Sequence, residues 1–103
     1  MMLKTVAGFD WDEGNKAKCQ KHGVSVAEIE VALSARSRVA PDLRHSDFEQ
    51  RFIAVERNYA GRPMFIAFTF REVGTQLFIR PISARYMHNR EIEKYEKSSN
   101  TSH

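Results

Sequence analysis

The chain has 103 residues and a mass of 11.9 kDa, the size of one domain with a modest hydrophobic core. With 42% hydrophobic and 28% charged residues it is not a disordered polymer, and no apolar run approaches the ~20 residues that a membrane helix needs. Residues 1–9 lack the apolar stretch of a secretory signal, and Cys19 is the single cysteine, which excludes a disulfide within the chain. We therefore expect a cytoplasmic protein.

The arginines are distributed unevenly along the chain. The net charge of +3 by itself argues only weakly for an anionic partner. All ten arginines, however, lie within residues 36–90, a segment that contains no lysine. The planar guanidinium suits paired hydrogen bonds to phosphate. Compositional bias of the source genome explains these arginines equally well, and their confinement to one segment is the reason to consider a functional role as well.

Two helices are predicted after a short first strand. Residues 5–9 are apolar and weakly strand-like. Asp10 or Asp12 can cap a helix that runs to His22 and stops at Gly23. Ser25 with a glutamate three residues later forms a capping box, which predicts that a second helix begins there. The short turn between the two helices predicts an αα-hairpin.

The period of the hydrophobic residues then changes from helical to alternating. Residues 37–40, 51–58, 64–71 and 76–83 are rich in Phe, Ile and Val and are separated by turn residues, which predicts four strands. Pro81 has no N–H to donate, so it requires an edge or a bulge at its position in the last strand.

A third helix is predicted over residues 89–97, followed by a disordered polar tail over 98–103. The expected order is β-α-α-β-β-β-β-α in a single domain of residues 1–97. Helices separated from an antiparallel meander indicate an α+β domain with the helices on one sheet face. The other face is then open to solvent or to a ligand.

Arginines are the main candidates for a site on that open face. Alternation along the central strand places Met64, Ile66, Phe68 and Phe70 in the core and directs Arg71 to the opposite side. An antiparallel sheet can gather several arginines there, although sequence does not fix the strand register. Ordinary solvated arginines are the alternative. The candidates are Arg51, Arg57, Arg71, Arg80 and Arg85.

The histidines have two interpretations each. His22 at a helix end can interact with the helix dipole or take part in chemistry, and His45 lies in a polar loop where it is either functional or merely solvated. Cys19 and His22 have CxxH spacing, but nothing nearby completes a zinc site. We expect neither a metal nor another cofactor.

This inventory is compatible with metal-free cleavage of RNA. That reaction uses the ribose 2′-OH and needs a base, an acid, cations on the phosphorane and groups that place the substrate. Arginine, histidine and tyrosine side chains can fill these roles, but their presence does not demand this reaction. A non-catalytic module that binds RNA or protein, such as a corepressor subunit, is the alternative.

Several short motifs together resemble the BrnT family of bacterial toxins over about residues 8–96. No single tetrapeptide is specific, but their order and spacing are. The matching pieces are Phe9–Asp12 (FDWD), Lys21–Ser25 (KHGVS), Asp42–Ser46 (DLRHS), Glu49–Phe52 (EQRF), Phe68–Arg71 (FTFR), Ile82–Arg85 (ISAR), and Arg90–Glu91 with Tyr95–Glu96. The sequence departs from the pattern at Glu56, Pro81 and Met87, which affects the expected shape of the sheet rim.

The resemblance implies a type II toxin with a RelE-like fold that cleaves RNA and inhibits translation. It also implies a co-encoded antitoxin with a ribbon-helix-helix DNA-binding part, a toxin–antitoxin heterotetramer, and contact with DNA only through that complex. No membrane contact is expected.

The family pattern also suggests roles for individual residues. Arg71 and Arg85 match its strand-end and post-strand arginines, while His22, Arg44 and His45 match its other polar positions. The expected catalytic residues are Arg71, Arg85, His22 and His45, and the expected RNA-binding residues are Arg44, Arg51, Arg57 and Arg80.

Overall fold

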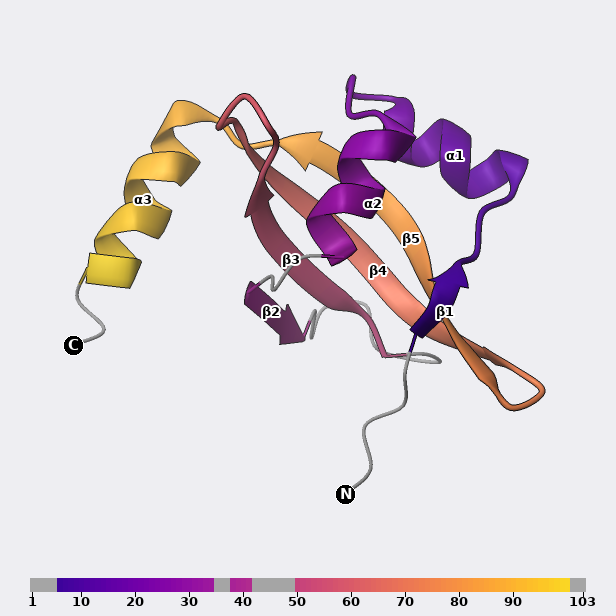
Figure 1. Ribbon diagram of the computed structural model, residues 1–103. Coiled ribbons are helices and arrows are strands. Elements are labelled where there is room, and N and C mark those ends of the chain that lie inside the picture. Colours follow the sequence, from indigo (N-terminus) through magenta and orange to yellow (C-terminus); the bar gives the residue numbers. More distant parts are fainter. Residues whose placement is uncertain (1–5, 35–37, 42–49, 101–103) are drawn as a thin grey trace.

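The computed structural model describes residues 6–34, 38–41 and 50–100, with the backbone alone at 38–41 and 98–100 (Figure 1). Its element order is the predicted β-α-α-β-β-β-β-α, and the fold is α+β as expected. The positions of Arg44 and His45 lie outside the described residues. The elements are β1 (Val6–Phe9), α1 (Glu13–Gln20), α2 (Val26–Ser34), β2 (Arg38–Pro41), β3 (Phe52–Arg57), β4 (Pro63–Val73), β5 (Gln76–Tyr86) and α3 (Asn89–Asn100).

The strands form one five-stranded sheet in the order β1-β5-β4-β3-β2. Strands β2 to β5 are an antiparallel meander, as predicted. The first strand departs from this pattern because β1 joins the outer edge of β5 in parallel, so the complete sheet is mixed. Gly74, with φ +61, makes the tight two-residue turn between β4 and β5 at an angle that other residues rarely adopt.

A bulge interrupts the pairing of β4 with β5. Phe68 lies opposite Pro81, whereas the preceding Ala67 lies opposite Ser83, so β5 carries Ile82 as an extra residue. The bulge removes the need for an N–H at Pro81, which confirms the expectation that this proline requires an edge or a bulge. Beyond it, β5 continues to Tyr86, three residues further than predicted.

Local hydrogen bonds begin both early helices where the sequence indicates. Asp12 is the N-cap of α1 and exchanges hydrogen bonds with Asn15, at 2.9 and 2.7 Å. Ser25 and Glu28 form the predicted capping box of α2, at 3.0 and 3.1 Å. The first helix ends at Gln20, two residues earlier than predicted, and the turn that follows it includes Gly23 at φ +90.

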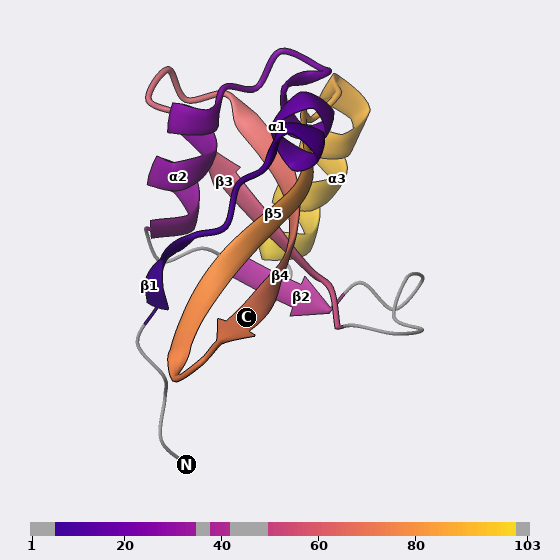
Figure 2. The same ribbon diagram turned by 90° about the vertical axis from the view of Figure 1, so that its right-hand side faces the viewer.

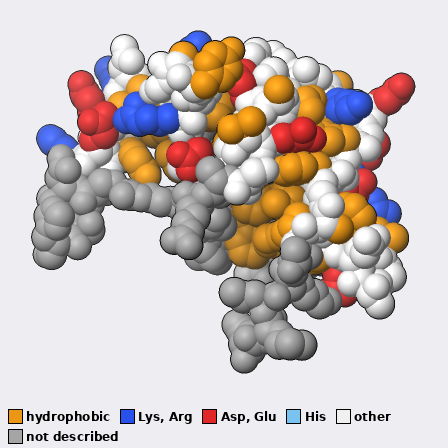
Figure 3. Space-filling view, in the orientation of Figure 1, with side chains coloured by type: hydrophobic (Ala, Val, Ile, Leu, Met, Phe, Trp, Pro, Cys, Tyr) orange, Lys and Arg blue, Asp and Glu red, His pale blue; other side chains and the backbone are white. Residues whose placement is uncertain are grey.

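The helices α1 and α2 cover one face of the sheet, and the core lies between them and the strands (Figures 1 and 2). Blue and red side chains are scattered among apolar ones over this covered side of the molecule (Figure 3). A smaller apolar cluster joins Ala54, Phe68 and Ile79, whereas Phe70, which alternation also assigned to the core, is 40% exposed. The main cluster contains the buried residues Cys19, Val24, Ile29, Ala32, Met64, Ile66 and Ala84.

The third helix differs from the other two in its position. Figure 2 shows α2 and α3 on opposite sides of the strands, so the prediction of helices on one face holds for α1 and α2. Ile92 and Tyr95 of α3 border a small hollow of about 110 Å³ beside Val55 and Arg57. The helix extends to Asn100, past the predicted end, because residues 98–100 contain no helix breaker. Among the described residues, no helix is long and apolar enough to cross a membrane.

Candidate functional site

The sheet face opposite α1 and α2 carries two neighbouring hollows. The larger has a volume of about 520 Å³ and an apolar floor formed by residues of β3, β4 and β5. Basic side chains from three parts of the chain surround that floor. The described residues that line it are Lys18, His22, Arg51, Ile53, Phe65, Ala67, Ile82, Ser83, Ala84, Arg85 and Glu91.

The second hollow, of about 460 Å³, shares Lys18, Arg51 and Ile82 with the first. We call the two together the basic groove. Their shared residues make the groove continuous along β5, from Arg80 at one end to Arg85 at the other. The remaining residues of the second hollow are Asp12, Gly14, Asn15, Arg80 and Pro81.

Asn15 fixes the first helix against the bulge beside this groove. Its side-chain N–H groups donate to the carbonyl oxygens of Asp10 and Pro81, both at 2.9 Å, and the residue is buried. Lys18 and His22 follow on the same helix and its C-terminal turn, four residues apart. Because residues at that spacing lie on one side of a helix, both side chains reach the groove from the edge of β5.

Arg51 enters the groove from the start of β3. The hydroxyl of buried Thr69 donates to the Gln50 carbonyl at 2.6 Å, which fixes the backbone immediately before Arg51. The Nε atom of Arg51 is buried and has no hydrogen-bond partner among the described residues. Arg51 therefore places a cation between the two hollows with part of its donor capacity unused.

Arg85 lies at the far end of the larger hollow and is paired with Glu91 at the start of α3. Its two terminal nitrogens donate to the two Glu91 oxygens at 2.8 and 2.7 Å, and its guanidinium lies 4.6 Å above the ring of Phe65. The backbone N–H of His88 also donates to Glu91, at 2.9 Å. The pKa of Glu91 is lowered to about 2, first by Arg85 and then by His88, and the same ion pair raises the pKa of Arg85.

Arg80 and Arg71 form a second set of ion pairs with two aspartates. Arg80 contacts Asp12 at 2.8 Å and Asp10 at 3.3 Å, while Arg71 contacts Asp10 at 3.0 Å. The pKa of Asp12 is lowered, chiefly by the backbone N–H of Asn15 that it caps and then by Arg80. The hydrogen bond from Arg80 to Asp12 in turn raises the pKa of that arginine.

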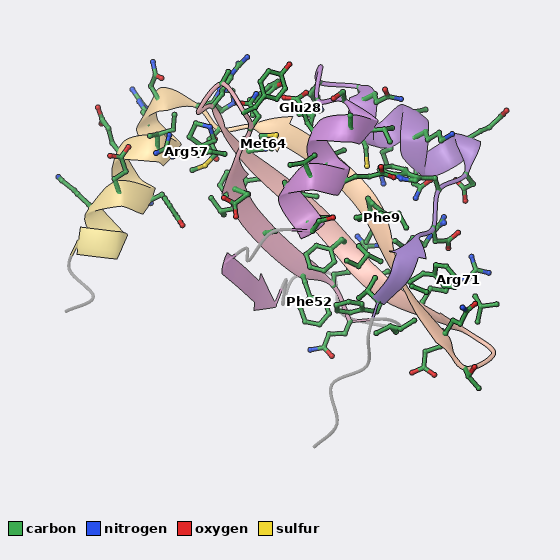
Figure 4. The ribbon with its side chains drawn as sticks, viewed as in Figure 1. Phe9, Glu28, Phe52, Arg57, Met64 and Arg71 are labelled. Atoms are coloured by element: carbon green, nitrogen blue, oxygen red, sulfur yellow. The ribbon has the colours of Figure 1, made fainter. Side chains whose placement is uncertain are left out.

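The structure brings together four of the residues expected from sequence and separates two. His22, Arg51, Arg80 and Arg85 all line the basic groove. Arg57 and Arg71 lie outside the basic groove, at opposite ends of the sheet (Figure 4).

The two arginines outside the groove have other contacts and positions. Arg57 donates to the Gly61 carbonyl at 2.8 Å and lies 3.8 Å from Glu96 of α3. Arg71 lies six positions along β4 from Phe65, the residue opposite Arg85, a separation of about 20 Å. The structure therefore does not bring Arg71 and Arg85 to one phosphate.

Two residues of the groove were missed by the sequence analysis. Lys18 could have been found because it precedes His22 by one helical turn. Glu91 could not be placed from sequence, because its contact with Arg85 depends on where α3 starts relative to the sheet. Among the described residues, no three His, Cys, Asp or Glu side chains form a group that could hold a metal ion.

Comparison with known protein families shows the family to which this chain belongs. Residues 11–91 match the family model described as "Ribonuclease toxin, BrnT, of type II toxin-antitoxin system". The chain belongs to this family. A search among curated proteins gave no match. Each described residue that lines the basic groove, from Asp12 to Glu91, falls within the range matched by the BrnT model. The BrnT assignment makes the chain a ribonuclease toxin whose partner is an antitoxin.

Proposed function

We propose that this BrnT toxin is a metal-independent endoribonuclease whose active site is the basic groove. The observation that supports the proposal is the meeting of His22, Lys18, Arg51 and Arg85 around one hollow on the open sheet face. Cleavage through the ribose 2′-OH needs proton transfer and stabilisation of charge on the phosphorane, and these side chains can supply both.

Each residue of the groove has a role in this proposal. Arg85 presents two N–H donors to the phosphorane oxygens, and Lys18 and Arg51 neutralise the reacting phosphate or its neighbour. His22 moves a proton. Arg80 holds the RNA backbone in the second hollow, where its pairs with Asp10 and Asp12 fix its orientation.

The other arginines and the second histidine have peripheral or open roles. Arg71 lies about 20 Å along β4 from the position opposite Arg85. We therefore assign it to binding parts of the RNA away from the reacting phosphate. Arg57 has the same peripheral role at the opposite end. Arg44 and His45 keep the roles that the family pattern implies, RNA binding and proton transfer, and belong to the 42–49 segment outside the described residues.

The proposal extends to the partner and to the cellular effect. We propose that the toxin cleaves RNA in the cytoplasm, so that translation is inhibited, and that a cognate antitoxin neutralises it by covering the groove. In this proposal the antitoxin carries a ribbon-helix-helix part, joins the toxin in a heterotetramer, and makes all the contacts with DNA. An acidic segment of the antitoxin would complement the cations of the groove.

The competing proposal is a groove that binds RNA or protein without chemistry. Both proposals predict salt-dependent RNA binding, so the test is cleavage. Purified toxin incubated with RNA in EDTA should yield 5′-hydroxyl ends and 2′,3′-cyclic phosphates, and His22→Gln should slow this about 100-fold or more. RNA that stays intact with EDTA, with added Mg²⁺ and with added ribosomes would support the binding module instead.

A further inference from the structure

Glu91 is the carboxylate of the larger hollow. Among the described residues that line this hollow, it is the one acid beside two arginines, a lysine and a histidine. The other acid of the basic groove, Asp12, accepts the backbone N–H of Asn15 as the cap of α1 and is also bound to Arg80. Asp12 lines only the smaller hollow, whereas Glu91 lines the larger one together with His22 and Arg85.

We propose that Glu91 is the general base of the ribonuclease reaction, accepting the proton of the attacking 2′-OH. This inference rests on the proposed function of the basic groove and adds a residue to it. Two contacts hold the carboxylate at the rim of the hollow, namely the paired hydrogen bonds from Arg85 and the backbone N–H of His88. These contacts place the carboxylate beside the hollow before substrate arrives.

The step balances with the groups that line the hollow. Glu91 takes the proton from the 2′-OH while the 2′ oxygen forms a bond to phosphorus. The bond from phosphorus to the 5′ oxygen breaks, and the imidazolium of His22 protonates that leaving oxygen. The products are a 2′,3′-cyclic phosphate and a 5′-hydroxyl end. Water later restores the two protonation states by carrying the proton from Glu91 to His22.

The ion pair with Arg85 has to rearrange for Glu91 to act as a base. An RNA phosphate that enters the hollow offers Arg85 a second anion, and Glu91 then shares or loses its partner. A carboxylate beside a phosphate and released from arginine binds a proton more readily. The substrate thereby converts a weak base into a stronger one at the place where the base is needed.

Several charged groups face Glu91 and affect its proton affinity. Arg85 on β5 is the nearest, and His88 precedes it on the way into α3. Lys18 and His22 from α1 and its C-terminal turn, with Arg51 at the start of β3, line the same hollow. All of these are cations or can become cations, so each one favours the ionised carboxylate.

The test compares Glu91→Gln with the parent toxin and with Glu93→Gln. Glutamine retains the size of the side chain and can still accept from Arg85, but it cannot take up a proton. Glu93 is exposed on the same helix and does not line the groove, so it controls for loss of one charge on α3. Cleavage of a short RNA in EDTA gives kcat, and a 2′-O-methyl RNA of the same sequence gives Kd without cleavage.

We expect Glu91→Gln to lower kcat at least about 100-fold while the Kd for the methylated RNA stays equal or becomes tighter. The acid-side decline in the kcat profile of the parent should be absent from the variant, whereas a structural role would preserve that decline. An unchanged or higher kcat in Glu91→Gln would overturn the inference and show that the carboxylate only blocks Arg85. A parent that leaves RNA uncut would instead overturn the proposed function.

Discussion

Arg80 and Arg85 lie on the same face of the sheet although five positions separate them along β5. In a regular strand an odd separation places two side chains on opposite faces. The pairing of β5 with β4 shows why these two arginines nevertheless share a face. Arg80 lies opposite Thr69 and Arg85 opposite Phe65, and the even separation of these two along β4 puts them on one face. The bulge at Ile82 supplies the extra residue that brings Arg85 back to the face of Arg80.

Arg85 should matter for RNA cleavage far more than Arg71. Arg85→Ala removes paired donors from the groove, and loss of one well-placed donor to a developing charge costs about 3–4 kcal/mol in the barrier. Arg71→Ala removes an arginine outside the groove and should slow cleavage only about two- to five-fold. Cleavage rates and thermal midpoints of both variants provide the measurement. Equal losses in the two variants would contradict the assignment of Arg85 to the reacting phosphate.

Lys18 should contribute directly to RNA affinity because it lines both hollows of the groove. Lys18→Ala should weaken RNA binding and reduce the slope of log Kd against log salt concentration by about 0.7, the value for one contact with single-stranded nucleic acid. Fluorescence anisotropy with an uncleavable RNA at several salt concentrations measures the slope. The exposed Lys94 of α3 gives the matched control, and Lys94→Ala should leave the slope near that of the parent.

Glu28 should stabilise the fold, since its carboxylate connects α2, the β3–β4 loop and β5. It accepts from the backbone N–H of Ser25 at 3.0 Å, from Asn58 at 2.7 Å and from the Tyr86 hydroxyl at 2.9 Å. Figure 4 shows Glu28 at the upper end of α2. Glu28→Ala should lower the free energy of unfolding by about 2 kcal/mol at pH 7, measured by denaturant titration. The exposed Glu93→Ala serves as control and should cost far less.

The same glutamate predicts a specific acid sensitivity. The backbone N–H of Ser25, followed by other hydrogen bonds, lowers the pKa of Glu28 from 4.5 to about 2. A lowered pKa in the folded state stabilises the protein above pH 4.5, and this contribution is lost as the pH falls from about 4.5 to about 2. The difference in unfolding free energy between the parent and Glu28→Ala should therefore shrink over that interval. A difference that stays constant from pH 6 to pH 3 would count against this role.

Cys19 should be unreactive in the folded toxin. The side chain is fully buried in the main core cluster, and burial raises the pKa of its thiol to about 11. Because the thiolate is the reacting species, iodoacetamide at pH 8 should label Cys19 only after the protein unfolds in denaturant. Mass spectrometry with and without urea gives the labelled fraction. Rapid complete labelling of native protein would show that α1 does not stay packed against the sheet.

Local signals in the sequence determined the elements and their order. The capping box of Ser25 and Glu28 sets the start of α2 through hydrogen bonds that span three residues, and so it can be recognised without the fold. Alternation assigned Met64 and Ile66 to the core for the same reason, because the side-chain period depends only on the strand itself. Pro81 predicted an irregularity from its missing N–H. The motifs shared with the BrnT family also come from the sequence alone.

Tertiary structure decided which of the arginines share a site. The groove joins residues from α1, the start of β3, β5 and the start of α3, and their meeting depends on strand register and on one inserted residue in β5. Register depends on turn geometry and on how neighbouring strands pair, so the alternation within one strand does not by itself show which residues of two strands lie opposite each other. Arg71 therefore matched the expected motif but lies away from the groove, while Lys18 and Glu91 entered the site through packing of helices against the sheet.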